Sequence, residues 1–153
     1  MTTIAWDGKT LAADRRVNFG GVTDAKVHKI VRREDGALAG SAGNTSLGAA
    51  FKRWFLSGEP GERPPLSREQ ETANGVIIRP SGLIEIHDVC GWYEAEAPHY
   101  ALGSGWEIAL GAMAAGASAE EAVRIAAKLD GNTGDEVETL TLPPPPAARL
   151  VGL

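Results

Sequence analysis

The chain has 153 residues, enough for one domain with a buried core, and its only cysteine, Cys90, excludes an intramolecular disulfide and a zinc site of clustered Cys and His residues. A net charge of −5, without any run of Lys or Arg, argues against a nucleic-acid-binding protein. No secretory signal opens the sequence, and its longest run of small apolar residues, 109–119, is too short and too rich in glycine to span a membrane. We therefore expect a soluble, cytoplasmic protein.

Two successive β-hairpins are predicted at the start of the chain. Asp7-Gly8 is a strong signal for a two-residue hairpin turn, and a second turn is indicated at residues 34–36. Gly20-Gly21 breaks the chain between the two hairpins. The predicted strands cover residues 3–6, 10–14, 26–33 and 37–42.

A helix and a long loop are predicted next. Asn44 or Thr45 can cap a helix that runs to about Leu56, and its core face holds apolar side chains at helical spacing, namely Leu47, Phe51, Trp54 and Phe55. Residues 58–73 are rich in proline, glycine and charge, which predicts an exposed loop. The strands that follow are expected at residues 75–79, 83–87 and 100–102.

The last part of the chain is predicted to hold a helix pair and a final strand. The first helix covers about residues 106–115. The second begins at Ser118, which has capping-box spacing to Glu121, and runs to Leu129. A turn-rich loop, 130–134, leads to a strand at 137–142. We expect one domain over residues 1–142 and a proline-rich C-terminal tail, extended or disordered, over residues 143–153.

The order of these elements predicts an α+β fold. Hairpins dominate the connections, which favours antiparallel pairing. Helices interleaved with hairpins indicate two packed sheets with helices outside rather than a doubly wound parallel sheet. The pattern of elements alone does not fix the order of the layers.

Thr2 is a candidate nucleophile because it follows the initiator methionine. Methionine aminopeptidase removes Met1 readily before a small residue, and Thr2 then becomes the N-terminus. A terminal threonine carries a hydroxyl that attacks a carbonyl and an α-amine that takes the proton, directly or through a water. The ordinary pKa of an α-amine, about 8, suits a base near neutral pH. A chance Met-Thr start is the other interpretation.

Six short segments, spread in order over residues 2 to about 142, form one pattern. They are Thr2-Thr3-Ile4, Ala13-Asp14-Arg15-Arg16, Lys26-Val27-His28-Lys29-Ile30, Ala39-Gly40-Ser41-Ala42-Gly43, Ala101-Leu102-Gly103-Ser104-Gly105 and Asp130-Gly131-Asn132-Thr133-Gly134. Together they resemble the proteasome β-subunits and the related bacterial peptidase HslV, which are N-terminal nucleophile hydrolases. Thr133 stands where that family usually has a serine.

The resemblance implies a four-layer αββα sandwich with antiparallel sheets. It also implies a threonine-type endopeptidase that cleaves polypeptides and assembles into closed homo-oligomeric rings, with a partner ATPase where energy coupling is needed. Thr2 takes the role of the nucleophile that forms an ester-linked acyl-enzyme. Lys29 is implied as an ammonium that keeps the Thr2 amine unprotonated, and Asp14 as the carboxylate that holds Lys29 charged and oriented.

The resemblance assigns supporting roles to four further residues. Backbone N–H groups of the bend at residues 40–43 are the candidate donors to the oxyanion, and Gly43 is preferred to Gly40. Ser104 would hydrogen-bond the Thr2 amine and relay its proton. Asp130 and Thr133 would position that serine and the terminal amine.

Each of these residues also has a structural interpretation. Lys29 and Asp14 can form an exposed ion pair of little energetic consequence, and Gly43 can serve a tight turn. Ser104 can cap a helix, and Asp130 and Thr133 can belong to a polar turn. If residues 26–33 form one strand, Val27 and Val31 share a face with Lys29, which predicts an apolar wall for a substrate side chain or an ordinary half-buried strand.

Two other functions stay open, a small-amide hydrolase of the same N-terminal nucleophile type and a catalytically silent structural or assembly subunit. The sequence departs from the family pattern at Asn18, where a substrate-binding threonine is common, in a slightly shorter spacing from Thr2 to Lys29, and in the proline-rich tail. We expect no cofactor, no metal, and no binding to nucleic acid or membrane.

Overall fold

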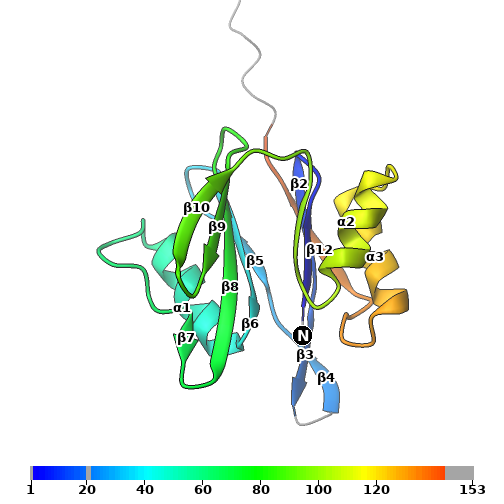
Figure 1. The fold of residues 1–153 in the computed structure, drawn as a ribbon, viewed down its shortest axis with the longest axis horizontal. Helices are drawn as coiled ribbons and strands as arrows, with labels where there is room; N and C mark the ends of the chain where they lie inside the picture. Colours follow the sequence, from blue (N-terminus) through cyan, green and yellow to red (C-terminus); the bar gives the residue numbers. More distant parts are fainter. Residues whose placement is uncertain (1, 20–21, 144–153) are drawn as a thin grey trace, which may run out of the picture.

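The computed structural model describes residues 2–19 and 22–143, and these residues form a four-layer sandwich (Figure 1). Two antiparallel sheets pack face to face, with one helix on the outer face of one sheet and two helices on the outer face of the other. The predicted α+β class with antiparallel sheets is therefore confirmed. Met1 and residues 144–153, which include most of the predicted tail, lie outside the described residues.

The first sheet is built around the N-terminal hairpin and has the strand order β11-β1-β2-β12. Its strands are β1 (Thr3–Trp6), β2 (Thr10–Asp14), β11 (Tyr100–Gly103) and β12 (Val137–Thr141). Asp7 closes the predicted turn because its carboxylate accepts the backbone N–H groups of Lys9 and Thr10, while Gly8 adopts a left-handed φ of +98°. The register pairs Thr3 with Gly103, so that β11 holds the start of the chain.

The second sheet contains the middle of the chain in the order β10-β9-β8-β6-β5, with β7 beside β8. Its strands are β5 (Ile30–Arg32), β6 (Leu38–Gly43), β7 (Ser67–Arg68), β8 (Glu71–Ile78), β9 (Ile84–Asp88) and β10 (Gly91–Ala95). A separate hairpin of β3 (Arg16–Phe19) and β4 (Val22–Lys26) projects beyond the two sheets at the end where the N-terminus lies (Figure 1).

Alternation along the strands sends neighbouring side chains into different layers. In β1, Ile4 and Trp6 lie between the two sheets, whereas Ala5 faces the helices. In β6, Leu38 lies between the sheets and Ala39 faces the outer helix layer. Burial of a side chain as large as Ile4 or Leu38 contributes about 1.5–3 kcal/mol. Because both faces of these strands are buried, their sequences are mostly apolar instead of alternating with polar residues.

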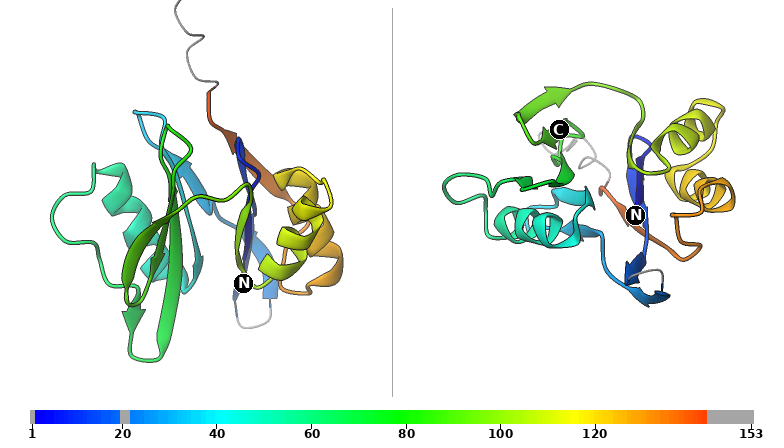
Figure 2. Two further views of the ribbon diagram at one scale, coloured as in Figure 1. Left: turned by 45° about the horizontal axis from the view of Figure 1, so that its top comes forward. Right: turned by 60° about the horizontal axis from the view of Figure 1, so that its bottom comes forward.

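The helices cover opposite sides of the sandwich, as the two views of Figure 2 show. On one side, α1 (Thr45–Leu56) is capped by Asn44, whose side chain accepts the N–H of Leu47 at 3.0 Å, and it buries Phe51 and Phe55 against the second sheet. On the other side, α2 (Trp106–Ala114) and α3 (Ala119–Leu129) pack on the first sheet. This layer is built mainly from alanines, namely Ala5, Ala12, Ala101, Ala109, Ala119 and Ala122. Small side chains on both partners allow close approach, which explains the abundance of alanine.

The prediction of one continuous strand over residues 26–33 is wrong, because residues 27–29 belong to no strand. β4 ends at Lys26 and β5 begins at Ile30. The backbone N–H groups of Lys29 and Ile30 donate to the carboxylate of Glu138 at 2.7 and 3.2 Å, so a side chain of β12 binds the backbone at this break. The prediction that Val27 and Val31 share a face with Lys29 therefore fails, and Val31 packs instead on the outer side of the second sheet.

Four strands were not predicted, and β4 is one of them, because only its last residue, Lys26, falls in the predicted strand at 26–33. The predicted loop at 58–73 ends early because β7 and the first residues of β8 form a hairpin within it. β3 and β10 were also absent from the prediction. β10 lies at the edge of its sheet with Trp92 and Tyr93 more than half exposed, so its sequence carries no burial pattern.

Candidate active site

Thr2 is fixed by the end of β11. Its carbonyl oxygen accepts the backbone N–H of Ser104 at 2.7 Å and is 3.4 Å from the Ser104 hydroxyl. Gly103 makes this contact possible, because it adopts a φ of +98° and a Cβ at that position would lie 1.8 Å from the Thr2 oxygen. Thr2 itself is 7% exposed, so a side chain near the chain end is held almost inside the protein.

Asp14 and Lys29 form a buried ion pair, and Lys29 lines a small pocket together with Thr2. The Lys29 Nζ donates to Asp14 Oδ2 at 3.0 Å, and the two side chains are 5% and 0% exposed. Asp14 also accepts the backbone N–H groups of Thr3 and Gly134, both at 2.9 Å. The interpretation as an exposed surface pair is therefore wrong. A buried pair of this kind needs additional hydrogen bonds to offset its desolvation, and the backbone of both neighbouring segments supplies them.

The environment of Lys29 shifts its titration. Burial lowers the pKa of the Lys29 ammonium below its ordinary value, although the Asp14 carboxylate and the more distant Glu138 act in the opposite direction. Glu138 was not singled out in the sequence. Its side chain fixes the backbone of the segment that carries Lys29, and no local pattern indicates that role because the two segments lie far apart in the chain.

A second polar network joins Ser104 to the C-terminal loop. Asp130 Oδ2 accepts the hydroxyls of Ser104 and Thr133, each at 2.6 Å. The Thr133 oxygen lies 2.6 Å from the Thr3 hydroxyl, which in turn accepts the N–H of Gly105 at 3.1 Å. Because the Thr133 proton is committed to Asp130, the Thr3 hydroxyl must donate to Thr133. The buried Thr3, which sequence reasoning did not single out, thus links the two halves of the network.

Ser104 does not cap α2. The N-cap residue is Gly105, it makes no side-chain cap, and the Ser104 hydroxyl is directed to Asp130 instead. The helix-cap interpretation of Ser104 is therefore wrong. Burial alone would raise the pKa of the Asp130 carboxyl, but the hydrogen bonds from Ser104 and Thr133 outweigh it and hold this pKa below its ordinary value. Asp130 is thus an ionised acceptor at neutral pH.

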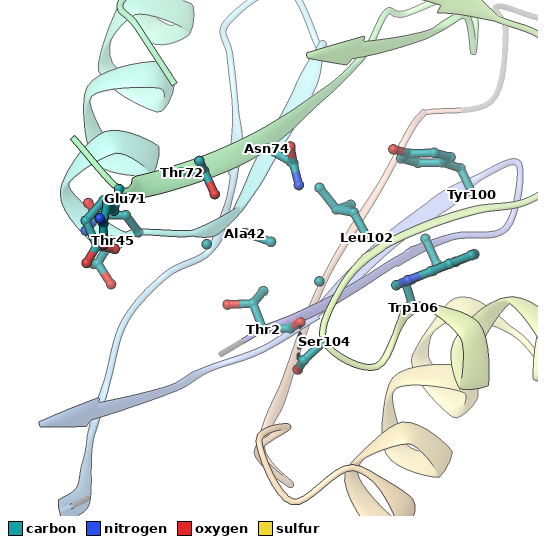
Figure 3. A pocket seen from close by; sticks show the side chains of 15 residues that line it. Thr2, Ala42, Thr45, Glu71, Thr72, Asn74, Tyr100, Leu102, Ser104 and Trp106 are labelled. Atoms are coloured by element: carbon teal, nitrogen blue, oxygen red, sulfur yellow. Dashed lines mark hydrogen bonds between the residues drawn. The ribbon is translucent and has the colours of Figure 1, made fainter. Parts of the chain in front are cut away.

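A cleft of about 830 Å³ opens beside Thr2 (Figure 3). Thr2 and Ser104 lie on one side, and Thr45, Glu71 and Thr72, from the start of α1 and of β8, lie across from them. Its volume lies in the range usual for ligand pockets, about 300–1,000 Å³, and leaves room for a few residues of an extended peptide. Tyr100 also lines the cleft, and burial raises the pKa of its hydroxyl to about 12, so it stays protonated at neutral pH.

Gly43 lies at the junction of this cleft with a smaller pocket. Both hollows are lined by Gly43 and Thr2. Gly43 adopts a φ of +100°, and a Cβ there would lie 2.5 Å from the carbonyl oxygen of Thr72, so its conformation accounts for a glycine. Gly40 lines neither hollow and packs against the core side chains of Ile30 and Ile4. Of the two candidate glycines, Gly43 is thus the one that lines the hollows.

The structure brings all seven predicted site residues into one region. Hydrogen bonds connect Thr2, Asp14, Lys29, Ser104, Asp130 and Thr133 through Thr3, and Gly43 joins them at the cleft. Among the side chains that the structure describes, no group of three or more His, Cys, Asp or Glu is arranged to hold a metal ion. Over residues 2–19 and 22–143, none of the helices has the length and apolar character needed to cross a membrane.

No protein-family model and no curated protein matches the sequence. Solved structures do match. BPH from Thiobacillus denitrificans in complex with epoxomicin is 24% identical with a TM-score of 0.68, covering 94% of this chain and 99% of that one. BPH without the ligand gives 23% identity and the same TM-score and coverage. Eukaryotic HslV from Trypanosoma brucei is 21% identical with a TM-score of 0.66, covering 92% of this chain and 98% of that one. The chain therefore has the four-layer αββα fold of HslV, as the resemblance of its sequence implied.

Proposed function

We propose that the protein is a threonine-type endopeptidase in which Thr2, freed by removal of Met1, attacks peptide bonds. One observation carries the proposal: a single hydrogen-bonded network joins Thr2 to a buried lysine–aspartate pair and to an ionised aspartate, beside a cleft large enough for a polypeptide. The shared fold with HslV and with BPH in its epoxomicin complex supports the same conclusion.

In the proposed first step the Thr2 hydroxyl oxygen bonds to the carbonyl carbon while the Thr2 α-amine takes the hydroxyl proton. The C–N bond of the substrate then breaks, and the proton passes to the leaving amine. A water, deprotonated by the same α-amine, hydrolyses the ester and restores the hydroxyl. The Lys29 ammonium disfavours a second positive charge on the α-amine, which keeps that amine available as a base.

Supporting groups divide the remaining tasks. A backbone N–H at Gly43 would stabilise the oxyanion, a contribution of roughly 3 kcal/mol for one donor. Ser104, held by the Asp130 carboxylate, would exchange a proton with the α-amine. Thr133, which hydrogen-bonds both Asp130 and Thr3, would hold these two residues in position. Asp14 keeps Lys29 charged and, through the N–H of Thr3, aligns the chain end with it.

An inert scaffold is a weaker explanation of these residues. Replacement of a buried ion pair by apolar side chains of similar volume is often neutral or stabilising, so stability alone does not require Lys29 and Asp14. Nothing in the open cleft of about 830 Å³ favours a small amide over a polypeptide. On the resemblance to HslV, we extend the proposal to ring assembly, a cytoplasmic location and a partner ATPase. Size-exclusion chromatography with light scattering tests the ring, and a stable monomer would count against it.

Intact-mass spectrometry combined with epoxomicin tests the chemistry. An epoxyketone offers one electrophilic carbon to a hydroxyl and another to an amine, so it reports both groups of a terminal threonine. We expect a processed chain, a stoichiometric adduct, and turnover of fluorogenic peptides. Thr2→Ala should lower turnover at least about a thousandfold, whereas Thr2→Ser, which keeps hydroxyl and amine, should retain part of it. A chain that retains Met1 and turns over no peptide would instead indicate the silent subunit.

A further inference from the structure

A second, smaller pocket adjoins the cleft and shares Thr2, Gly43, Asn44 and Thr45 with it. Its volume is about 40 Å³, and its lining includes Val17, Val27, Ser41 and two lysines, Lys29 and Lys52. A hollow that holds one water needs roughly 10–15 Å³ on the same measure, so this pocket accommodates a group of a few heavy atoms. It is therefore sized for one short side chain.

The charges around this pocket are unbalanced. The Lys29 ammonium is paired with Asp14, but the Lys52 ammonium donates to the backbone carbonyl of His28, at 3.0 Å, and forms no ion pair among the side chains that the structure describes. An ammonium has three donor hydrogens, so Lys52 has capacity for a further acceptor. Burial lowers the pKa of Lys52, and the nearby Lys29 acts in the same direction. The site thus holds a cation whose charge is poorly compensated.

No carboxylate among the described side chains pairs with the Lys52 ammonium. Among the described residues that line the pocket, none is acidic. Glu138 is close enough to raise the pKa of Lys52, but its two oxygens already accept the N–H groups of Lys29 and Ile30 and the ring nitrogen of His28. An anion that enters with a ligand is the partner that the Lys52 ammonium lacks.

We infer that this pocket receives the side chain of the substrate residue just before the scissile bond, and that Lys52 makes the enzyme prefer Asp or Glu at that position. The inference rests on the proposed function, because the hydroxyl that lines the pocket attacks the carbonyl of that same substrate residue. The Cα of this substrate residue is bonded to the attacked carbonyl carbon. Its side chain is therefore the one that reaches a hollow beside the nucleophile. Val17 and Val27 would contact its methylene groups and shield the new ion pair from water.

Peptides that differ only in charge test the inference. We expect kcat/KM to be at least about tenfold higher for a fluorogenic peptide with Asp before the cleaved bond than for the matched Asn peptide, and likewise for Glu against Gln. Lys52→Met should bring the Asp-to-Asn ratio close to one, while Lys52→Arg should keep it above one. Lys128→Met, which removes an exposed lysine at the end of α3, is the control and should leave the ratio unchanged.

The outcomes separate this inference from the proposed function. An enzyme that reacts with epoxomicin and cleaves peptides without preferring Asp or Glu would overturn the inference alone. An acidic preference that persists in Lys52→Met would also overturn it, because the selection would then come from another residue. No adduct and no turnover of any peptide would overturn both. If Lys52→Met does not fold, the ratios of the wild-type protein decide the question by themselves.

Discussion

The backbone N–H of Thr3 donates to the Asp14 carboxylate over 2.9 Å, and this contact ties the start of the chain to the ion pair behind it. The same carboxylate accepts the Lys29 ammonium, so the residue after the proposed nucleophile and the proposed cation share one acceptor. A shift of Asp14 would therefore displace both. This arrangement makes Asp14 the residue whose replacement has the widest consequences.

Asp14→Asn should destabilise the protein by about 3–5 kcal/mol, because it leaves the buried Lys29 ammonium without a counter-charge. Urea unfolding measures this loss. The double variant Asp14→Asn/Lys29→Met should recover part of the stability, since it removes the uncompensated charge, but none of the peptidase activity. The exposed i,i+4 pair Glu120–Arg124 provides a control, and Glu120→Gln should cost about 1 kcal/mol or less. Equal losses for the two carboxylates would contradict the buried role of Asp14.

Glu138→Gln should change the pH dependence of activity more than the fold. The amide oxygen of Gln can still accept the backbone N–H groups of Lys29 and Ile30, but its negative charge, which raises the pKa of Lys29, is gone. The Lys29 ammonium should then lose its proton at lower pH, so the alkaline limb of the kcat/KM profile shifts downward. Glu136→Gln, in the exposed neighbour that pairs with Arg15, should leave this limb in place. A profile identical to that of the wild type would remove Glu138 as a positioning residue.

Local patterns were sufficient for most of the elements and for the site residues that belong to short motifs. The Asp7-Gly8 turn, the Asn44 cap and the Ser118 cap, whose side chain accepts the N–H of Glu121, all depend on residues within a few positions of one another. Ser104 and Asp130 came from the resemblance, because their contact joins the start of α2 to the end of α3 and no local pattern predicts it.

The features that sequence reasoning missed depend on long-range contacts or on a lack of burial. Glu138 sits in an ordinary-looking strand, and only the pairing of β12 with β2 brings it to the break before β5. Thr3 looks like a neighbour of the nucleophile, yet its hydroxyl lies between Gly105 and Thr133. Lys52 falls outside the apolar positions of α1, which predicts an exposed side chain. Its place beside the pocket follows from how α1 packs.

Glu59→Gln should remove an acid-sensitive contribution to stability. Glu59 bridges Arg79 and Arg33, and hydrogen bonds from Arg79 and Arg33 outweigh burial and lower the pKa of Glu59 to about 2. Between its ordinary pKa near 4.5 and about 2, the unfolded chain binds a proton that the folded chain does not, so stability falls as the pH drops through this window. The contribution at neutral pH is roughly 3 kcal/mol at most.

Urea unfolding between pH 7 and pH 2 measures this effect. The wild-type free energy of unfolding should fall more steeply below pH 4.5 than that of Glu59→Gln. Glu34→Gln, at an exposed position of the neighbouring turn, should reproduce the wild-type slope. Parallel curves for Glu59→Gln and the wild type would show that the bridge carries no stability.

Gly103→Ala should abolish peptidase activity while most of the fold persists. The new Cβ would fall 1.8 Å from the Thr2 carbonyl oxygen, so the end of β11 and the chain start must move apart and the bond from the Ser104 N–H is lost. Gly36→Ala is the matched control, because Gly36 has a similar φ of +93° but nothing within 4 Å of its Cβ position. Gly36→Ala should lower the free energy of unfolding only by the backbone strain, about 1 kcal/mol, and keep full activity. Turnover of peptides and reaction with epoxomicin measure the difference. Comparable activity in the two variants would mean that the position of Thr2 does not depend on β11.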